Sequence, residues 1–288
     1  MAPATRALAQ TRPLVVASKT DAEGGLLGNL ILLALESGGV AVTSRLQLGP
    51  TRVLRTALLS GDIDLYPEYT GNGAFFFDRQ GDPAWHDAAA GYALIRRLDD
   101  TANRIVWLPP APADNTWAIA VRRDVAERLA LRDMAGFARA ADAGHLRLAA
   151  SAEFVESPAA LPAFESAYDF LFPRGRIVML PGGDTSATMR AAAERMGGVD
   201  CAMVYSTDGA LSVLDLVVMT DENRVQMVFQ PAPVIRADAL SRFPMIPGLL
   251  APVFARLDLA ALRRLNALVT VEGRPPRAVA QAFLSGAG

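Results

Sequence analysis

Residues 61–73 read Gly-Asp-Ile-Asp-Leu-Tyr-Pro-Glu-Tyr-Thr-Gly-Asn-Gly, and this stretch decides the fold. Ile63 and Leu65 alternate with acidic residues, which is the period of a strand. Pro67 and the two later glycines predict the end of the strand and the start of a loop. Open α/β sheets bind ligands at the carboxyl ends of their strands. The tyrosines, threonine and asparagine of this stretch are therefore expected either to line a small-molecule site or to pack around a simple β-turn.

The residues before this stretch alternate between strand and helix patterns. Apolar runs at 14–17 and 40–48 predict strands, and an apolar face at 26–34 predicts the helix between them. Pro50 predicts the first turn of a second helix. The inner face of that second helix is predicted to consist of Val53, Leu54, Ala57 and Leu58. This β-α-β-α-β order indicates a parallel sheet with helices on both faces.

Two proline-rich passages divide the rest of the chain. Residues 108–112 and 230–233 are predicted to be extended crossovers, and a second alternation of strands and helices lies between them. Such a layout indicates one domain inserted in another, with a cleft and a two-strand hinge. The predicted fold class is α/β, with two lobes that each contain a mainly parallel sheet flanked by helices.

Length and composition limit the possible classes of protein. The chain has 288 residues, enough for two domains, and its 51% hydrophobic and 20% charged residues are typical of a globular protein. The net charge is −2, so no nucleic-acid partner is predicted. The apolar run at 26–35 is too short to span a bilayer. A single cysteine, Cys201, excludes an internal disulfide and is expected to be a buried thiol.

The N-terminal residues 1–11 have no periodic pattern and are predicted to be a flexible remnant. They contain Ala7-Leu8-Ala9, an ending of the kind that signal peptidase leaves, although no basic and apolar leader precedes it. Two interpretations remain open, an exported protein whose signal peptide is removed or lies outside this sequence, and a cytosolic protein with a short tail.

Catalytic motifs are scarce. Neither His86 nor His145 has metal-ligand spacing, so no metal site is predicted, and no cofactor motif or phosphate loop occurs. Residues 182–186 predict either a helix cap or an anion site. The carboxylates Asp64 and Glu68 are the candidates for a glycosidase pair. The other interpretation is that Asp62 and Asp64 lie on one face of the strand and serve solvent or the ends of neighbouring helices. The prediction is that the protein is not an enzyme.

The chain resembles the substrate-binding proteins of bacterial osmoprotectant ABC importers, which bind glycine betaine, choline, carnitine and related compounds. The resemblance covers nearly the whole chain past Arg12. It rests on an ordered set of short matches: 17–19, 61–64, 68–71, 115–117, 206–211, 216–218, 231–234 and 271–284. It implies a two-lobed periplasmic binding protein of type II-like fold, with residues 12–112 plus 228–288 as lobe one and residues 113–227 as lobe two.

The resemblance also implies a cage of aromatic rings around a quaternary ammonium group. Matched position by position, the cage consists of Tyr69, Trp117, Tyr205 and Phe229. A methylated ammonium has no N–H to donate, so its diffuse charge is recognised by the negative faces of aromatic rings. Packing into the core is the alternative interpretation for each ring.

Relatives hold the carboxylate of a betaine with a lysine, a hydroxyl and an arginine. Lys19 matches the lysine and Asn72 stands at the hydroxyl position, whereas residues 154–160 contain no arginine. Further ligand-binding candidates are Thr70, Asn115, Glu156 and Ser157. Two ligand classes are open, a betaine that binds weakly, or choline or a larger methylated cation that has Glu156 near its charge.

The function predicted from these observations is a periplasmic solute-binding protein. It captures a quaternary-ammonium osmoprotectant in the cage and delivers it to the membrane permease of an ABC importer, and it is expected to be a monomer. The alternatives are the same fold with another ligand, such as ergothioneine or an amino acid, and a hydrolase that uses Asp64 and Glu68.

Overall fold

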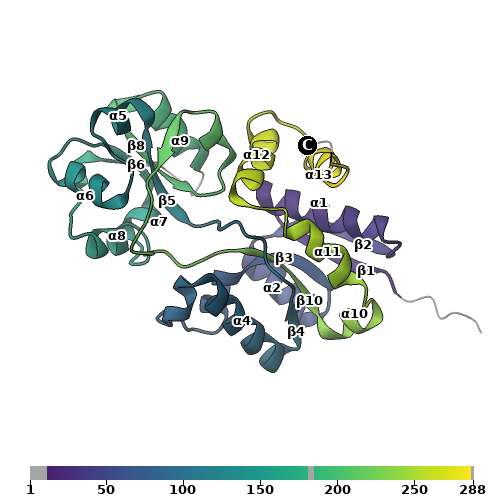
Figure 1. The fold of residues 1–288 in the computed structure, drawn as a ribbon. Helices are drawn as coiled ribbons and strands as arrows, with labels where there is room; N and C mark the ends of the chain where they lie inside the picture. The colour runs from purple at the N-terminus through teal and green to yellow at the C-terminus, as the bar shows by residue number, and fades with distance from the viewer. Residues whose placement is uncertain (1–11, 181–184, 287–288) are drawn as a thin grey trace, which may run out of the picture.

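The computed structural model describes residues 12–180 and 185–286. They form two lobes, each built on one five-stranded sheet (Figure 1). The strand order is β2-β1-β3-β10-β4 in lobe one and β7-β6-β8-β5-β9 in lobe two. In lobe one β1 pairs in parallel with β2 and β3, and in lobe two β6 pairs in parallel with β7 and β8. The predicted α/β class with two sheets flanked by helices is confirmed.

Lobe one takes its elements from both ends of the chain. Its strands are β1 (Leu14–Lys19), β2 (Val42–Gly49), β3 (Leu65–Tyr69), β4 (Ile105–Trp107) and β10 (Pro231–Arg236). Its α-helices are α1 (Ala22–Ser37), α2 (Thr51–Ser60), α3 (Gly73–Phe76), α4 (Ala88–Asn103), α10 (Ala237–Arg242), α11 (Ile246–Phe254), α12 (Leu259–Thr270) and α13 (Pro276–Leu284). The short 3-10 helices η1 (Thr70–Asn72) and η2 (Pro83–His86) also belong to it.

Lobe two is continuous in sequence. Its strands are β5 (Trp117–Arg122), β6 (Leu148–Ser151), β7 (Ile177–Leu180), β8 (Cys201–Tyr205) and β9 (Leu216–Val218). Its α-helices are α5 (Arg123–Arg128), α6 (Met134–Asp142), α7 (Ala152–Glu156), α8 (Leu161–Ala167) and α9 (Thr185–Ala193). Its 3-10 helices are η3 (Arg174–Arg176), η4 (Met196–Gly198) and η5 (Gly209–Ser212).

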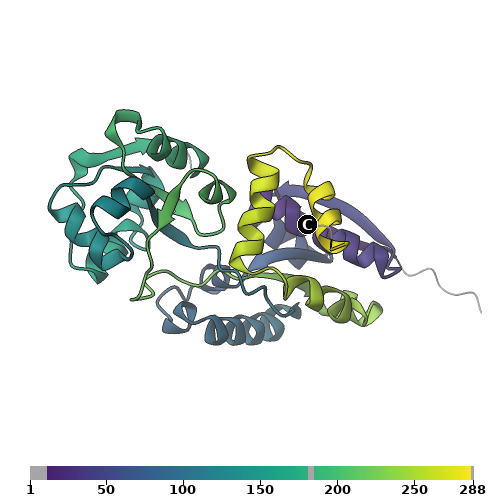
Figure 2. The same cartoon turned by 45° about the horizontal axis from the view of Figure 1, so that its top comes forward.

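Each sheet has one antiparallel strand, and in both cases it is the strand that follows a crossover. β5 runs antiparallel to β8 and β9, and β10 runs antiparallel to β3 and β4. The crossovers, residues 108–116 and 219–230, run between the lobes in both views (Figures 1 and 2). The predicted boundaries at 112/113 and 227/228 fall inside these segments and remain predictions.

Both lobes have apolar cores on the two faces of their sheets. Helix α1 is buried nearly all round, since Leu26, Leu30 and Leu35 are completely buried between sheet one and α11, α12 and α13. Each buried leucine contributes about 1.5–3 kcal/mol through removal of apolar surface from water. In lobe two, Phe137 and Phe154 occupy the equivalent place against sheet two.

The prediction for the inner face of α2 was partly wrong. Leu54 and Leu58 are buried as expected, but Val53 is 44% exposed. The third buried side chain of the helix is Arg55, which forms a bidentate ion pair with Asp99 of α4 at 2.6 and 2.7 Å. The buried apolar face of α2 is therefore limited to Leu54 and Leu58, and the ion pair of Arg55 with Asp99 is buried where apolar packing was expected.

The predicted end of β3 was also wrong, because the strand continues through Pro67 to Tyr69. Its neighbour β10 places Pro233 opposite Pro67. The Thr70 N–H donates to Gln230 O, so Thr70 and Gln230 form a hydrogen-bonded pair. In an antiparallel ladder such pairs alternate with pairs that are not hydrogen-bonded. Counting back along the strands, the two prolines face each other at a non-hydrogen-bonded position. No donor is missing from the β3–β10 ladder, so this ladder tolerates both prolines. On its other side Pro233 only accepts, from Leu108 N. For the same reason Pro231 and Pro233 lie in β10 and not in the predicted crossover.

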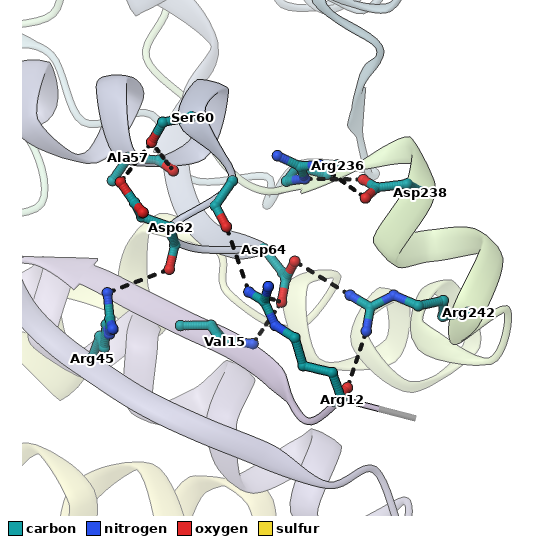
Figure 3. A network of polar contacts seen from close by, with 11 residues as sticks. Arg12, Val15, Arg45, Ala57, Ser60, Asp62, Asp64, Arg236, Asp238 and Arg242 are labelled. Atoms are coloured by element: carbon teal, nitrogen blue, oxygen red, sulfur yellow. Dashed lines mark hydrogen bonds and ion pairs between the residues drawn. The ribbon is translucent and has the colours of Figure 1, made fainter. Parts of the chain in front are cut away.

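Of the two environments predicted for Asp64, the structure shows the neighbouring helix end and not solvent, because its side chain is only 3% exposed and pairs with Arg242, the last residue of α10. Asp64 accepts a hydrogen bond from Val15 N at 2.9 Å and pairs with Arg242 at 3.3 Å and with Arg12 at 3.7 Å (Figure 3). Asp62 instead bonds to Ser60 Oγ at the exposed end of α2. Asp64 thus joins the start of β1 to α10 within lobe one.

Some predictions fall outside the described residues. These are the flexible remnant at 1–11 and the part of the cap or anion site at 182–184. Within the described part of the chain, no helix has the length and apolarity that crossing a bilayer requires.

Candidate functional site

A pocket of about 730 Å³ lies between the two lobes, and both lobes contribute to its wall. Seven of the residues that the sequence analysis named as candidates for ligand binding line this pocket. These are Lys19, Tyr69, Asn72, Asn115, Trp117, Tyr205 and Phe229. They come from the ends of β1, β3, β5 and β8 and from both crossovers, so the carboxyl-end rule locates much of this wall.

Three candidates do not line the pocket, namely Thr70, Glu156 and Ser157. The Thr70 hydroxyl donates to Val228 O at 3.1 Å and accepts from Gln230 N at 3.1 Å, so it fastens the end of β3 to the second crossover. Glu156 is exposed in the last turn of α7. The pocket receives Glu153 instead, because α7 starts at the carboxyl end of β6 and its first turn is the one beside the cleft.

Trp117 and Tyr205 form an aromatic wall on lobe two. They are direct partners in the ladder of β5 and β8, and their rings are stacked with centroids 6.3 Å apart and an interplanar angle of 23°. Phe154 supports Trp117 from the core with an edge contact at 6.1 Å. The indole Nε1 is buried without a hydrogen-bond partner among the described residues. This wall is therefore held by packing, and one polar atom in it remains unsatisfied.

On lobe one, Tyr69 is buried and Lys19 lies over its ring, with Nζ 4.5 Å from the ring centroid. The same ammonium pairs with Glu68 Oε1 at 2.5 Å. Asn72 Nδ2 also donates to Glu68 Oε1, at 2.7 Å, and Tyr66 Oη donates to Glu68 Oε2 at 2.9 Å. Both groups that the resemblance assigns to a ligand carboxylate are therefore bonded to a carboxylate of the protein.

Glu23, in the first turn of α1, is a pocket residue that the sequence interpretation missed. Its Oε1 accepts from Tyr69 Oη at 2.6 Å and from Asn115 Nδ2 at 3.0 Å, and its Oε2 accepts from Asn266 Nδ2 at 2.6 Å. Burial raises the pKa of the Glu23 carboxyl, and burial together with this carboxylate raises the pKa of the Tyr69 phenol. The acidic first turn of a helix was the only signal in the sequence, and it is common in helices without a site.

The two crossovers are bonded to each other, and this positions Phe229. Asn115 N donates to Phe229 O at 3.0 Å, and Phe229 N donates to Asp114 Oδ1 at 2.6 Å. Thr116 Oγ1 adds a bond to Met227 O at 3.1 Å. Burial raises the pKa of Asp114 to about 6. Residues 114–116 and 227–229 of the two crossovers are thus joined by hydrogen bonds, and one of these bonds is accepted by the Asp114 carboxylate.

A third contact between the lobes joins α12 to the segment after β8. Arg263 Nε donates to Ser206 O at 2.6 Å, and Asn266 Nδ2 donates to Thr207 O at 2.9 Å. At Gly209 the backbones approach so closely that a Cβ atom would lie 2.2 Å from Ala267 N. Asn266 therefore bonds at once to the pocket carboxylate of Glu23 and to the backbone of lobe two.

The hydrolase candidates do not form a catalytic pair. Asp64 lies in the network of Figure 3, away from the pocket wall, and Glu68 is neutralised by Lys19. Among the described residues, no group of three or more His, Cys, Asp or Glu side chains is placed to hold a metal ion.

Comparison with known proteins supports the same conclusion. A family model described as the substrate binding domain of ABC-type glycine betaine transport system matches residues 12–286. The glycine betaine-binding protein YehZ of Escherichia coli is 48% identical over 277 residues, which is 96% of this chain and 91% of that protein. A glycine-betaine-binding protein of Pseudomonas aeruginosa is 32% identical and covers 96% and 88% of the two chains.

Solved structures agree in fold. The apo YehZ structure from Escherichia coli superposes with a TM-score of 0.86 at 48% identity, over 96% of this chain and 99% of that one. A glycine betaine/carnitine/choline ABC transporter structure has a TM-score of 0.83 at 18% identity, over 95% and 98% of the two chains. The family predicted from the sequence is confirmed, and the hydrolase alternative is not supported. The chain belongs to the family of substrate-binding domains of ABC-type glycine betaine transport systems, and it is a solute-binding component of an importer, not an enzyme.

Proposed function

We propose that the chain captures a quaternary-ammonium osmoprotectant, such as choline or glycine betaine, in an aromatic cage between its lobes. The observation that supports the proposal is that the four predicted cage residues line one pocket, together with a fifth aromatic side chain, Phe75. Tyr69 comes from lobe one, Trp117 and Tyr205 from lobe two, and Phe229 from the second crossover. Each contact of a methylated ammonium with a ring contributes roughly 0.5–2 kcal/mol, the upper end applying when water is excluded.

The charges of the pocket wall favour a cation over a zwitterion. Among the described residues that line the wall, Lys19 alone is basic, whereas four are carboxylates. The acidic ones are Asp21, Glu23, Glu153 and Asp208. A ligand carboxylate would have to compete with Glu68 for Lys19 and Asn72, and the wall contains no arginine for a bidentate contact. We therefore expect choline-like cations to bind more tightly than betaines.

Binding is proposed to shift a hinge equilibrium toward a closed form. The ladder of Asp114, Asn115 and Phe229 would act as the hinge, because it is the narrow place where both crossovers run together. A ligand that touches rings of both lobes binds the closed form better, which is the differential affinity that a population shift requires.

The place of action is proposed to be outside the cytoplasmic membrane, in the periplasm, where the loaded protein meets the importer's permease. Membership of the family supports this location, and the ending Ala7-Leu8-Ala9 is compatible with removal of a signal peptide.

Isothermal titration with a matched set of ligands tests the proposal. The set contains choline, glycine betaine, carnitine and ergothioneine, together with ethanolamine and glycine as the unmethylated partners of the first two. We expect the methylated cations to bind more tightly than their unmethylated partners, because ring faces attract a methylated ammonium but cannot replace the hydrogen bonds that water makes to N–H groups. Equal binding of ethanolamine and choline would contradict the cage.

A further inference from the structure

We propose that Glu23 is the counter-charge that selects the cationic group of the ligand, a role that rests on the proposed function and makes it more specific. Glu23 belongs to the pocket wall and its side chain is largely buried. Four neutral side chains form hydrogen bonds with its carboxylate, namely Tyr69, Asn115, Asn266 and Thr207. No ion pair to Glu23 occurs among residues 12–180 and 185–286.

A buried carboxylate without a cation is unusual, since burial of a charge is costly unless the charge is paired. Every other buried acidic side chain of lobe one has a cationic partner: Glu68 has Lys19, Asp99 has Arg55, and Asp64 has Arg242. Glu23 is the exception, and it is the one that lines the pocket. A cation that enters the pocket would supply the partner that the protein does not provide.

The orientation of the neighbouring amides supports a charged carboxylate. Asn266 Nδ2 donates to both Glu23 Oε2 and Thr207 O, and Asn115 Nδ2 donates to Glu23 Oε1. Because a backbone carbonyl can only accept, the bond to Thr207 O fixes the NH₂ group of Asn266, and that group therefore also faces Glu23. The position of Glu23 at the N-terminus of α1 adds the favourable interaction of a negative charge with the helix dipole.

Tyr69 connects the counter-charge to the proposed cage. Its hydroxyl donates to the Glu23 carboxylate, which pushes electron density into the ring and makes the ring face more negative. Glu23 thus acts on a cation directly, by its charge, and through the ring of Tyr69. Both effects need a ligand with a positive charge, and neither helps a neutral ligand of the same shape.

Protonation of Glu23 removes both effects. Burial raises the pKa of Glu23 above the ordinary 4.5, and a bound cation lowers this pKa again. At acidic pH, where part of the free protein carries a proton on Glu23, binding of a cation therefore releases protons. The charged and titratable side chains on the elements around Glu23 are Asp21 before α1, Lys19 of β1, Tyr69 of β3, Arg263 of α12 and Asp208 before η5. Lys19 is bonded to Glu68 and Arg263 to Ser206 O, so neither neutralises Glu23 in this structure.

The test compares choline with its uncharged isostere, in which a tert-butyl group replaces the trimethylammonium group. Glu23→Gln should weaken choline binding by about tenfold or more and isostere binding by no more than about twofold, because only the charge interaction is lost. Glu36→Gln is the matched control, since Glu36 lies at the exposed far end of the same helix and pairs with Arg277. Equal losses for choline and isostere would mean that Glu23 only shapes the pocket, and would overturn the proposal.

A second measurement needs no substitution at Glu23, in case that variant does not fold. Titration calorimetry in two buffers of different ionisation enthalpy counts the protons that binding releases. The Asp114→Asn background removes the contribution of the hinge carboxylate. Proton release with choline but not with the isostere supports the proposal, and identical values for both overturn it. Absence of binding by choline and glycine betaine alike would instead overturn the proposed function, and this inference with it.

Discussion

Trp117 and Tyr205 lie directly opposite each other in the ladder of β5 and β8, with their ring centroids 6.3 Å apart. This spacing makes the two rings one continuous wall, since it leaves no room for a trimethylammonium group between them. We therefore expect a cation to bind in front of this wall, between lobe two and the rings of Tyr69 and Phe229.

The first prediction concerns Trp117. Trp117→Ala should weaken choline binding by roughly tenfold to thirtyfold, because a desolvated ring contact contributes up to about 2 kcal/mol. Calorimetry measures the change. Tyr92→Ala is the control, because Tyr92 is an aromatic residue of α4 whose hydroxyl bonds to Trp107 O outside the pocket. Unchanged affinity in Trp117→Ala would remove this ring from the cage.

The second prediction concerns the buried pair of Lys19 and Glu68, whose side chains are 8% and 0% exposed. Lys19→Met should lower the free energy of unfolding by about 3–5 kcal/mol, because it leaves Glu68 buried and unpaired. Urea unfolding measures this change. Lys19→Met combined with Glu68→Gln should recover most of the loss, and a double variant no more stable than the single one would contradict the explanation.

The third prediction concerns Asp114 and pH. Its pKa is raised from 3.8 to about 6, so the native state holds this proton more tightly than the unfolded state. The resulting stability is fully present below pH 3.8 and is lost as the pH rises through 6.

Asp114→Asn keeps an acceptor for Phe229 N and has no charge to bury. It should therefore be more stable than the wild type at about pH 7.5, by an amount of order 1–3 kcal/mol, and gain less on acidification. Thermal melts across this pH range measure both effects. Asp100→Asn, at an exposed position of α4, is the control and should change neither. A lower melting temperature of Asp114→Asn at neutral pH would show that the charge itself holds the hinge.

The fourth prediction concerns the close approach at Gly209. Gly209→Ala places a Cβ atom 2.2 Å from Ala267 N, so α12 and the segment after β8 must move apart. We expect a loss of stability of about 1–3 kcal/mol from overpacking, together with weaker choline binding, because Asn266 would lose its bond to Thr207 O. Gly248→Ala in α11 is the matched control, since nothing lies within 4 Å of its Cβ, and it should be neutral or stabilising.

Much of the fold follows from local patterns in the sequence. The period-two strands, the leucine face of α1 and the proline-rich crossovers predict two α/β lobes, because each pattern acts over a few residues. The end of β3 could not be predicted in this way. Whether Pro67 ends a strand depends on its partner, and Pro233 lies far away in sequence and supplies a position where no donor is required.

The site was predictable only where strand ends or the resemblance identify it. Tyr69 and Tyr205 lie at the carboxyl ends of β3 and β8, as the rule requires, whereas Trp117 begins β5 and follows only from the resemblance; all three line the pocket. Their role in binding remains a proposal. Glu23 could not be found, because nothing local distinguishes a buried acidic residue in a first turn from a solvated one. Its burial is decided by Asn266, which is more than two hundred residues away in sequence.

The position of β10 limits the order in which the two lobes can fold during synthesis. Strand β10 lies in the middle of its sheet, between β3 and β4, yet it is synthesised after the whole of lobe two. The first hundred residues to emerge therefore leave β3 and β4 without their shared neighbour until residues 231–236 appear. Lobe one can therefore complete its sheet only after lobe two has been synthesised.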